Sequence, residues 1–130
     1  VLNAIREEIT TIPKAGSSRY GDLFEHFILG EIYRLNEYEE LHLQLHYWRT
    51  NSGTEVDIIL SRSDQPVIAI EIKSSDQLET SDLRALKEFT NEYPTCQALL
   101  INCSEEEIII DNVRVVPWKK LAKVLLQLLQ

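Results

Sequence analysis

Two short apolar segments carry the charged side chains that are best placed to do chemistry. Thr54–Leu60 contains Asp57 between apolar neighbours, and Val67–Lys73 ends with Glu71 and Lys73. Both segments are short, rich in β-branched residues and bounded by turn residues, so we expect two strands. Side chains alternate between the faces of a strand, which puts Glu71 and Lys73 on one face. Charges on such strands cost free energy unless they are paired or bound to a metal, so the pattern predicts a compensating partner.

A divalent cation is a partner that would satisfy both carboxylates. On neighbouring strands, Asp57 and Glu71 aim oxygens at one hard cation, Mg²⁺ or Mn²⁺, and the carbonyl of Ile72 is a third candidate ligand. Such a metal lowers the pKa of its bound water and polarises a phosphoryl group. Lys73 is then placed to orient the attacking water and to stabilise charge on the phosphate. The four residues make a workable site for phosphodiester hydrolysis.

Glu25 is a candidate fourth side chain of the same site. Its neighbours on one helical face are Ile28, Leu29 and Ile32, at offsets of three, four and seven. A lone carboxylate inside an apolar stripe is unusual. We therefore expect Glu25 either to bind the metal or to act as a base that orients water.

Each of these charged residues also has a structural interpretation. Glu71 and Lys73 would form an ion pair of little energetic value if the strand lay at a sheet edge. Glu25 would be a partly solvated helix residue paired with Arg34 or Lys73, and we give this interpretation equal weight. Glu55 shares a face with Asp57 but is more often a solvated strand residue than a ligand.

Other residues with chemical potential are better explained by the fold. His42 and His46 lie four apart on one strand face, a spacing that does not bring two side chains together, so we expect surface residues and no zinc site. Trp48, next to Arg49, is a candidate nucleic-acid contact, but packing under the sheet is the favoured interpretation.

The periodicity of apolar residues predicts an α/β fold with a central mixed sheet. We expect a short helix over residues 1–12 and a linker over 13–18. The helix Thr80–Glu92, between the strands Val67–Lys73 and Ala98–Asn102, would form a right-handed parallel crossover. The elements that follow are a helix, three strands in a meander, a helix, a strand, a short strand pair and a final helix: Tyr20–Asn36, Leu41–Thr50, Thr54–Leu60, Val67–Lys73, Thr80–Glu92, Ala98–Asn102, Ile108–Ile110 with Val113–Val116, and Trp118–Leu129.

Composition limits the class of protein. The 130 residues suffice for one domain with a sizeable core, and the net charge of -8 argues against a strong nonspecific grip on nucleic acid. No apolar run reaches transmembrane length, so no membrane is expected as a partner. Cys96 and Cys103 are typical of a reduced, cytoplasmic protein. The chain begins at Val1 and contains no methionine, as an excised piece of a longer protein would.

The residues of the candidate site resemble those of a known superfamily. Asp57, then Glu71-Ile72-Lys73, preceded by a helix that carries Glu25, are similar to the PD-(D/E)XK nucleases. That superfamily has a restriction-endonuclease-like α-β-β-β-α-β core, which matches the element order expected here. Val56 stands where the superfamily name implies proline, a departure that is common among its members.

A narrower resemblance covers residues 18–130. The segments Gly21–Glu25, Trp48–Asp57 and Ala69–Ser74, with Pro117-Trp118 before the last helix, resemble the C-terminal domain of unknown function of prokaryotic AAA-type ATPases. The resemblance implies an ATPase module upstream in the full-length chain, with residues 1–17 as the end of a preceding region. No phosphate-binding Gly-rich loop occurs here, so no ATPase activity is expected of this piece.

The resemblance implies two functions of different classes. One is a metal-dependent nuclease domain that acts on DNA and is tethered to an ATPase. The other is a catalytically silent module of the same fold that binds a partner or nucleic acid and regulates that ATPase. A third use, a homo-oligomer contact through the Trp118–Leu129 helix, rests on the apolar end of that helix.

Overall fold

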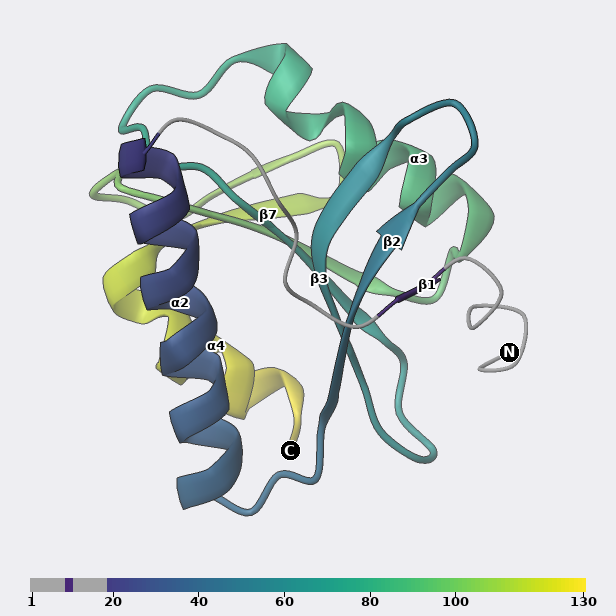
Figure 1. Cartoon of the computed structure of the whole chain (residues 1–130), viewed down its shortest axis with the longest axis vertical. Helices are drawn as coiled ribbons and strands as arrows, with labels where there is room; N and C mark the ends of the chain where they lie inside the picture. Colours follow the sequence, from purple (N-terminus) through teal and green to yellow (C-terminus); the bar gives the residue numbers. More distant parts are fainter. Residues whose placement is uncertain (1–8, 11–18) are drawn as a thin grey trace.

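A computed structural model of the chain describes residues 9–10 and 19–130, and these form one layered α/β arrangement (Figure 1). A seven-stranded sheet has the strand order β1-β2-β3-β4-β5-β7-β6. The expected α/β fold, with a central mixed sheet flanked by helices, is confirmed. The elements in chain order are β1 (Ile9–Thr10), α2 (Arg19–Tyr38), β2 (Gln44–Arg49), β3 (Glu55–Ser61), β4 (Ile68–Ile72), the 3-10 turn η1 (Thr80–Leu83), α3 (Arg84–Glu92), β5 (Gln97–Asn102), β6 (Ile108–Ile110), β7 (Val113–Pro117), the 3-10 turn η2 (Trp118–Lys120) and α4 (Leu121–Leu128).

The sheet combines an antiparallel half and a parallel half. β2, β3 and β4 form the expected meander, with Ile58 opposite Ile70 where β3 meets β4. β5 pairs parallel to β4, and β7 pairs parallel to β5. A parallel pair requires a crossover, and α3 supplies the one between β4 and β5. The short pair of strands near the end is also confirmed, because β6 runs antiparallel to β7.

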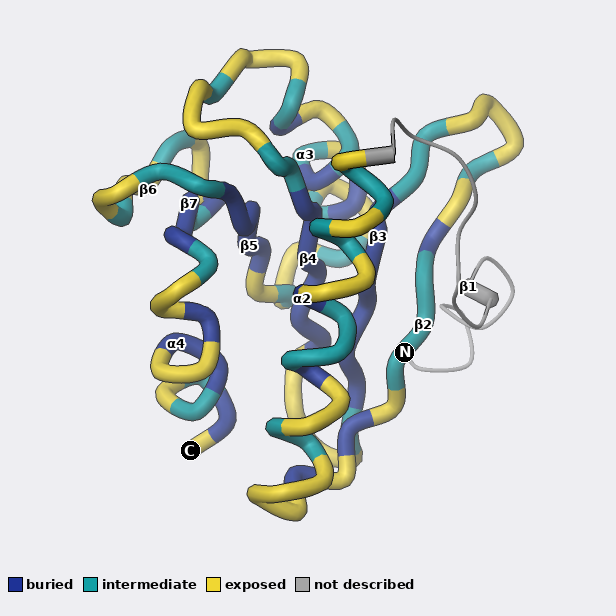
Figure 2. Tube along the Cα trace, turned by 60° about the vertical axis from the view of Figure 1, so that its left-hand side comes forward, coloured by how far each residue is buried: buried dark blue, intermediate teal, exposed yellow. Residues whose placement is uncertain are grey.

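Each face of the sheet has its own apolar core. On one face Ile28 and Ile32 of α2 and Leu125 of α4 pack over Ile70 and Ile101. On the other face Leu86 and Phe89 of α3 pack with Trp48, Ala69 and Leu100, which are all buried. Figure 2 shows the central strands as the buried layer between these helices. Strands covered on both faces read as near-continuous apolar runs, which is how β4 and β5 appear in the sequence.

The α3-side core confirms that Trp48 packs under the sheet. Its ring lies edge-on to that of Phe89, with the ring centroids 5.2 Å apart. Edge-to-face contact is a favoured geometry for aromatic pairs and adds to the burial of their area. Trp48 is therefore a core residue and not a nucleic-acid contact.

The second strand begins later than its apolar alternation predicts. The expected strand over Leu41–Thr50 starts at Gln44 because Glu40 and His42 have φ values of 51° and 60°, which no regular strand accommodates. The Asn36 side chain stabilises this bend: its amide donates to the Leu43 carbonyl, and its oxygen accepts the Leu43 N–H. Leu43 and Leu45 both pack in the α2-side core.

The helix expected over residues 1–12 is wrong at the two residues of this range that the structure describes. Ile9 and Thr10 form β1, which pairs antiparallel with β2, so that Ile9 lies opposite Trp48 and Thr10 opposite Tyr47. The outer edge of β2 offers unpaired backbone groups, and pairing with them outweighs the helical spacing of apolar residues. Residues 1–8 and the expected linker over 13–18 lie outside the described residues.

The final helix starts with η2 and continues as α4, close to the expected Trp118–Leu129. Leu121, Val124 and Leu125 are buried in the α2-side core, and Leu129 is buried there too. The apolar end of this helix, a candidate contact between two copies of the chain, is thus partly buried in the chain's own core. A homo-oligomer stays a prediction. Among residues 9–10 and 19–130 no helix combines the length and apolar character needed to cross a bilayer.

Both cysteines are present as thiols, and burial makes Cys96 less reactive. Burial raises the pKa of the Cys96 thiol to about 11, from about 9, and burial together with the Asp76 carboxylate raises the pKa of Cys103. At pH 8 the native Cys96 therefore has a ~100-fold smaller thiolate fraction than an ordinary thiol. A more basic thiolate is also more nucleophilic, which recovers roughly a factor of ten of the lost reaction rate. We expect iodoacetamide to label Cys96 about tenfold more slowly in the native chain than in urea, measured by peptide mass spectrometry. Equal rates would contradict the burial of this thiol.

Candidate functional site

Asp57 and Glu71 lie together where β3 and β4 run side by side. The Asp57 N–H donates to Glu71 Oε1 at 3.1 Å, and the Ile72 N–H donates to Asp57 Oδ2 at 2.8 Å. Each carboxylate thus binds the backbone of the opposite strand, just beyond the Ile58–Ile70 pair. Both residues are only 7% exposed. We call this arrangement the carboxylate pair; it holds two acidic groups at fixed positions in the centre of the sheet.

A β-bulge in β3 turns the backbone at Asp57. His46 pairs with Ile59 and Trp48 with Val56, so Asp57 and Ile58 together oppose the single residue Tyr47. A bulge re-aims side chains and is common next to functional sites. Its effect is visible in the core, because Val56 packs on the α3 side and Ile58 on the α2 side, although strict alternation would put them on one face.

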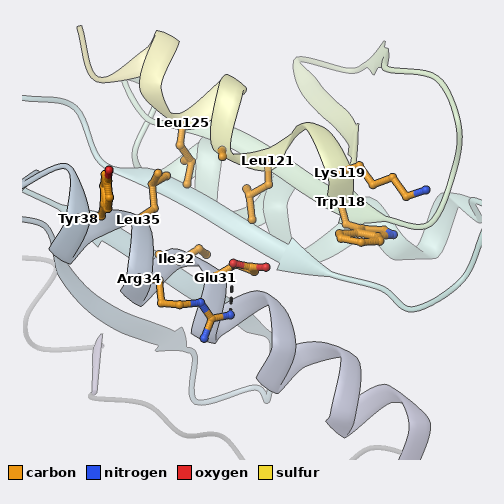
Figure 3. Close-up of a pocket in the computed structure, with 10 residues that line it drawn as sticks. Glu31, Ile32, Arg34, Leu35, Tyr38, Trp118, Lys119, Leu121 and Leu125 are labelled. Atoms are coloured by element: carbon orange, nitrogen blue, oxygen red, sulfur yellow. Dashed lines mark ion pairs between the residues drawn. The ribbon is translucent and has the colours of Figure 1, made fainter.

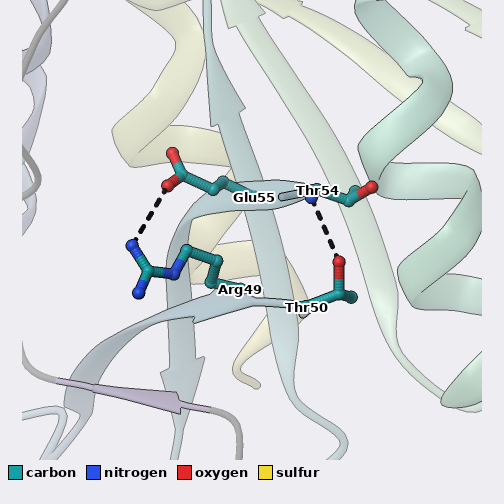
Figure 4. Close-up of polar contacts among 4 residues, drawn as sticks. All are labelled: Arg49, Thr50, Thr54 and Glu55. Atoms are coloured by element: carbon teal, nitrogen blue, oxygen red, sulfur yellow. Dashed lines mark hydrogen bonds and ion pairs between the residues drawn. The ribbon is translucent and has the colours of Figure 1, made fainter. Parts of the chain in front are cut away.

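A polar pocket of about 340 Å³ opens beside the carboxylate pair. Glu71 lines it from β4 and Glu55 from β3; the other lining residues come from the β2–β3 turn and from η1 and α3: Ser52, Gly53, Thr54, Ser81, Arg84 and Ala85. Glu55, expected to be a solvated strand residue more often than a ligand, keeps partial contact with solvent. It is half-buried at the pocket, and its Oε1 lies 3.9 Å from the Arg49 guanidinium (Figure 4).

The β2–β3 turn is a well-bonded wall of this pocket, which we call the hairpin wall. The Thr50 N–H donates to the Thr54 carbonyl at 2.9 Å, and the Thr54 N–H donates to Thr50 Oγ1 at 3.1 Å (Figure 4). The hydroxyls of Thr50 and Ser52 lie 2.8 Å apart. Gly53 has a φ of +95°, a conformation that favours glycine, and a Cβ there would meet open space. Asn51-Ser52-Gly53 therefore forms the turn between β2 and β3.

Of the remaining predicted site residues, Ile72 and Lys73 directly follow Glu71 in the chain, and Glu25 lies on α2. Lys73 follows β4, is half-buried and donates its N–H to the Ile101 carbonyl at 2.9 Å. Ile72 is buried, with its N–H engaged by Asp57. Glu25 is half-buried on α2, and the first turns of α2 lie towards the end of β4 (Figures 1 and 2). The structure joins Asp57 to Glu71 directly, whereas roles for Glu25 and Lys73 stay predictions.

The chemistry of the carboxylate pair suits a hard cation that keeps most of its own water. Within the part of the chain that the structure describes, no three His, Cys, Asp or Glu side chains are grouped so as to hold a metal ion. Mg²⁺ needs no such cage, because it is usually held by one or two carboxylates, with waters and substrate phosphates completing the octahedron. Asp57, Glu71 and the Ile72 carbonyl match that pattern. His42 is exposed, in keeping with its expected place on the surface.

Sequence reasoning did not anticipate a second pocket, of about 350 Å³, between α2 and α4. Figure 3 shows Leu35, Leu121 and Leu125 in it, with the Glu31–Arg34 ion pair of 3.2 Å at its rim. Nearby on α2, Phe27 packs edge-on against Trp118 with the ring centroids 5.3 Å apart. The sequence signal for this pocket was that α2 carries more large apolar residues than the core can bury. One of them, Tyr38, is 82% exposed.

The fold and the carboxylate pair describe a mixed α/β domain with an acidic site in the centre of its sheet. Comparison with protein families matches residues 20–121 to the family described as "Domain of unknown function (DUF4143)". The match covers most of the chain, and the chain belongs to this family. No curated protein matches it.

One solved structure is similar in its backbone. It is described as a refined half-complex from the tetradecameric assembly of Thermococcus gammatolerans McrB AAA+ hexamers with bound McrC. The two sequences are 15% identical and the TM-score is 0.48. The similarity covers 82% of the present chain and 33% of the other, so the present chain spans about a third of that protein's length.

Proposed function

We propose that this domain hydrolyses phosphodiester bonds with the help of Mg²⁺ or Mn²⁺, as the resemblance to PD-(D/E)XK nucleases implies. The observation that carries the proposal is the carboxylate pair: Asp57 and Glu71 are buried in the centre of the sheet, bonded to each other's strand and adjacent to a polar pocket. Buried carboxylates beside a pocket are typical of functional sites. Burying a charged group costs free energy, so such a group is seldom kept for stability alone.

Each residue of the predicted site has a proposed role in hydrolysis. Asp57, Glu71 and the Ile72 carbonyl would hold the cation, which supplies a water of lowered pKa and polarises the phosphoryl group when bound. Lys73, on the Glu71 face of β4, orients the attacking water and stabilises the negative charge that develops on the phosphate. Glu25 serves as a second ligand or as a base that positions the water.

The proposed substrate is DNA, and the proposed context is the C-terminal part of an AAA-type ATPase. With a net charge of -8, the domain has weak and salt-sensitive affinity for nucleic acid on its own. The upstream ATPase module would therefore deliver the strand to the site.

Cleavage assays with Lys73→Ala test the proposal. Plasmid, single-stranded DNA and RNA are incubated with Mg²⁺ or Mn²⁺, and products are followed on gels. We expect the wild type to cut DNA and Lys73→Ala to lose about a hundredfold in rate, the effect of removing one donor to a developing anion. Lys123→Ala, which removes the same charge from an exposed position of α4, is the matched control. Equal cleavage by wild type and Lys73→Ala would reject the role of Lys73.

One observation favours a second function, that of a catalytically silent module which binds a partner or nucleic acid and regulates the ATPase. The backbone N–H groups of Asp57 and Ile72 already donate to the two carboxylates, so the pair has compensating contacts without a metal. No cleavage of any of the three substrates would support this function over hydrolysis.

A further inference from the structure

We propose that Arg84, with the hairpin wall and Ser81, forms a binding subsite for one phosphate of a nucleic-acid strand whose neighbouring phosphate lies at the carboxylate pair. The inference rests on the proposed function, because it names the part of the pocket that holds the substrate. The subsite is assigned to the phosphodiester backbone and not to a base. The side of the pocket away from the carboxylates of Glu55 and Glu71 offers a guanidinium, hydroxyls and backbone, with Ala85 as its one apolar side chain.

The position of Arg84 makes it the cation of the pocket. It is the first residue of α3 and exposed, and it lies across the pocket from the hairpin wall. Among the described residues that line the pocket, Arg84 alone is basic, while Glu55 and Glu71 are acidic. A phosphate entering beside two carboxylates needs a compensating positive charge, and a guanidinium provides it with two parallel hydrogen bonds.

The charge of Arg84 is also available. The ion pairs formed among the described residues engage Arg34, Arg49, Lys87 and Arg114, and none of them engages Arg84. Arg49 differs, because it pairs with Glu55 and does not line the pocket. A guanidinium that faces a pocket without a carboxylate partner is free to exchange water for a ligand anion.

The shape of the pocket limits what enters. Its volume of about 340 Å³ is at the low end of the range of ligand sites, roughly 300–1,000 Å³, and is of the size of one nucleotide unit. The hairpin wall is held by its own hydrogen bonds, and the space next to Gly53 is open. We therefore expect an unpaired strand or a strand end to bind better than an intact duplex.

Fluorescence anisotropy of labelled oligonucleotides in EDTA tests the subsite without any cleavage. Single-stranded DNA, single-stranded RNA and duplex DNA are titrated with wild type, Arg84→Ala, Arg84→Lys and Arg34→Ala. We expect Arg84→Ala to weaken binding of single strands about tenfold and to lower the salt slope by about one. Arg84→Lys should recover part of the affinity, because it restores charge without the bidentate geometry. Arg34→Ala, which removes an exposed arginine at the other pocket, should bind as the wild type does.

The outcomes separate this inference from the proposed hydrolysis. If Arg84→Ala and Arg34→Ala bind with the same affinity and salt slope, or if the wild type binds no oligonucleotide, the subsite is wrong. If Arg84→Ala loses binding while the wild type cuts nothing, the subsite stands and hydrolysis fails. Circular dichroism of each variant checks the fold, and the exposure of Arg84 predicts no change.

Discussion

Asp57→Asn is expected to keep its stability but lose metal binding, whereas Asp57→Ala is expected to lose metal binding and part of its stability. In the asparagine variant an amide oxygen still accepts the Ile72 N–H, but the negative charge that attracts a cation is gone. In the alanine variant that buried N–H has no acceptor, which costs about 1–3 kcal/mol of the free energy of unfolding. Calorimetric titration with Mn²⁺ and urea denaturation measure the two effects separately.

The two variants form each other's control. The wild type should release or absorb heat on binding Mn²⁺, and both variants should lose this signal by at least about tenfold in affinity. Mn²⁺ binding by Asp57→Asn at wild-type affinity would show that Asp57 is not a ligand. No heat in the wild type would leave the carboxylate pair with its structural role and favour the silent module.

Phe89→Ala should give the largest loss of stability in the α3-side core. Phe89 is fully buried, and its ring contacts those of Trp48 and Tyr93, with centroids 5.2 and 4.7 Å away. Removing a buried phenyl ring costs about 3–5 kcal/mol, a sizeable part of the roughly 5–15 kcal/mol that keeps a domain folded. Urea denaturation followed by tryptophan fluorescence measures the loss.

The neighbouring position provides the control for this measurement. Glu88 is exposed on the same helix, so Glu88→Ala should change the free energy of unfolding by less than about 0.5 kcal/mol. A loss below about 1 kcal/mol for Phe89→Ala would contradict the packing of α3 on the sheet. Because α3 and η1 carry Arg84 and Ser81, undocking this helix would also open the polar pocket.

The apolar periodicity of the sequence was sufficient to predict most elements of the fold. Short β-branched runs predict the strands with Asp57 and Glu71, and helical spacing predicts the helix with Phe89 and hence the parallel crossover. These patterns arise because a buried face requires apolar residues at the period of its strand or helix. Departures arise where backbone geometry or pairing decides. The positive φ of His42 makes β2 begin later in the sequence than predicted. The backbone groups at the outer edge of β2 pair with Ile9 and Thr10, which therefore form a strand.

The candidate site could be predicted by residue but not by geometry. Spacing alone singled out Asp57 and Glu71, and the structure brings them together. The bulge opposite Tyr47 and the hydrogen bonds to the partner strand could not be predicted, because a bulge adds one residue without leaving a compositional mark. The part of Glu55 and Arg84 in the pocket depends on the approach of the β2–β3 turn to α3, a contact between segments distant in sequence.

The sheet ends in two short edge strands, β1 with two residues and β6 with three. On β6, Ile108 and Ile109 are 45% and 69% exposed. Unpaired backbone beside exposed isoleucines is a template for intermolecular strand addition. β6 is only three residues long, and the exposed Glu105 and Glu106 precede it, whereas Glu107 pairs with Arg114. Copies that approach at this edge meet like charges, so a short strand and two exposed carboxylates act as gatekeepers against aggregation.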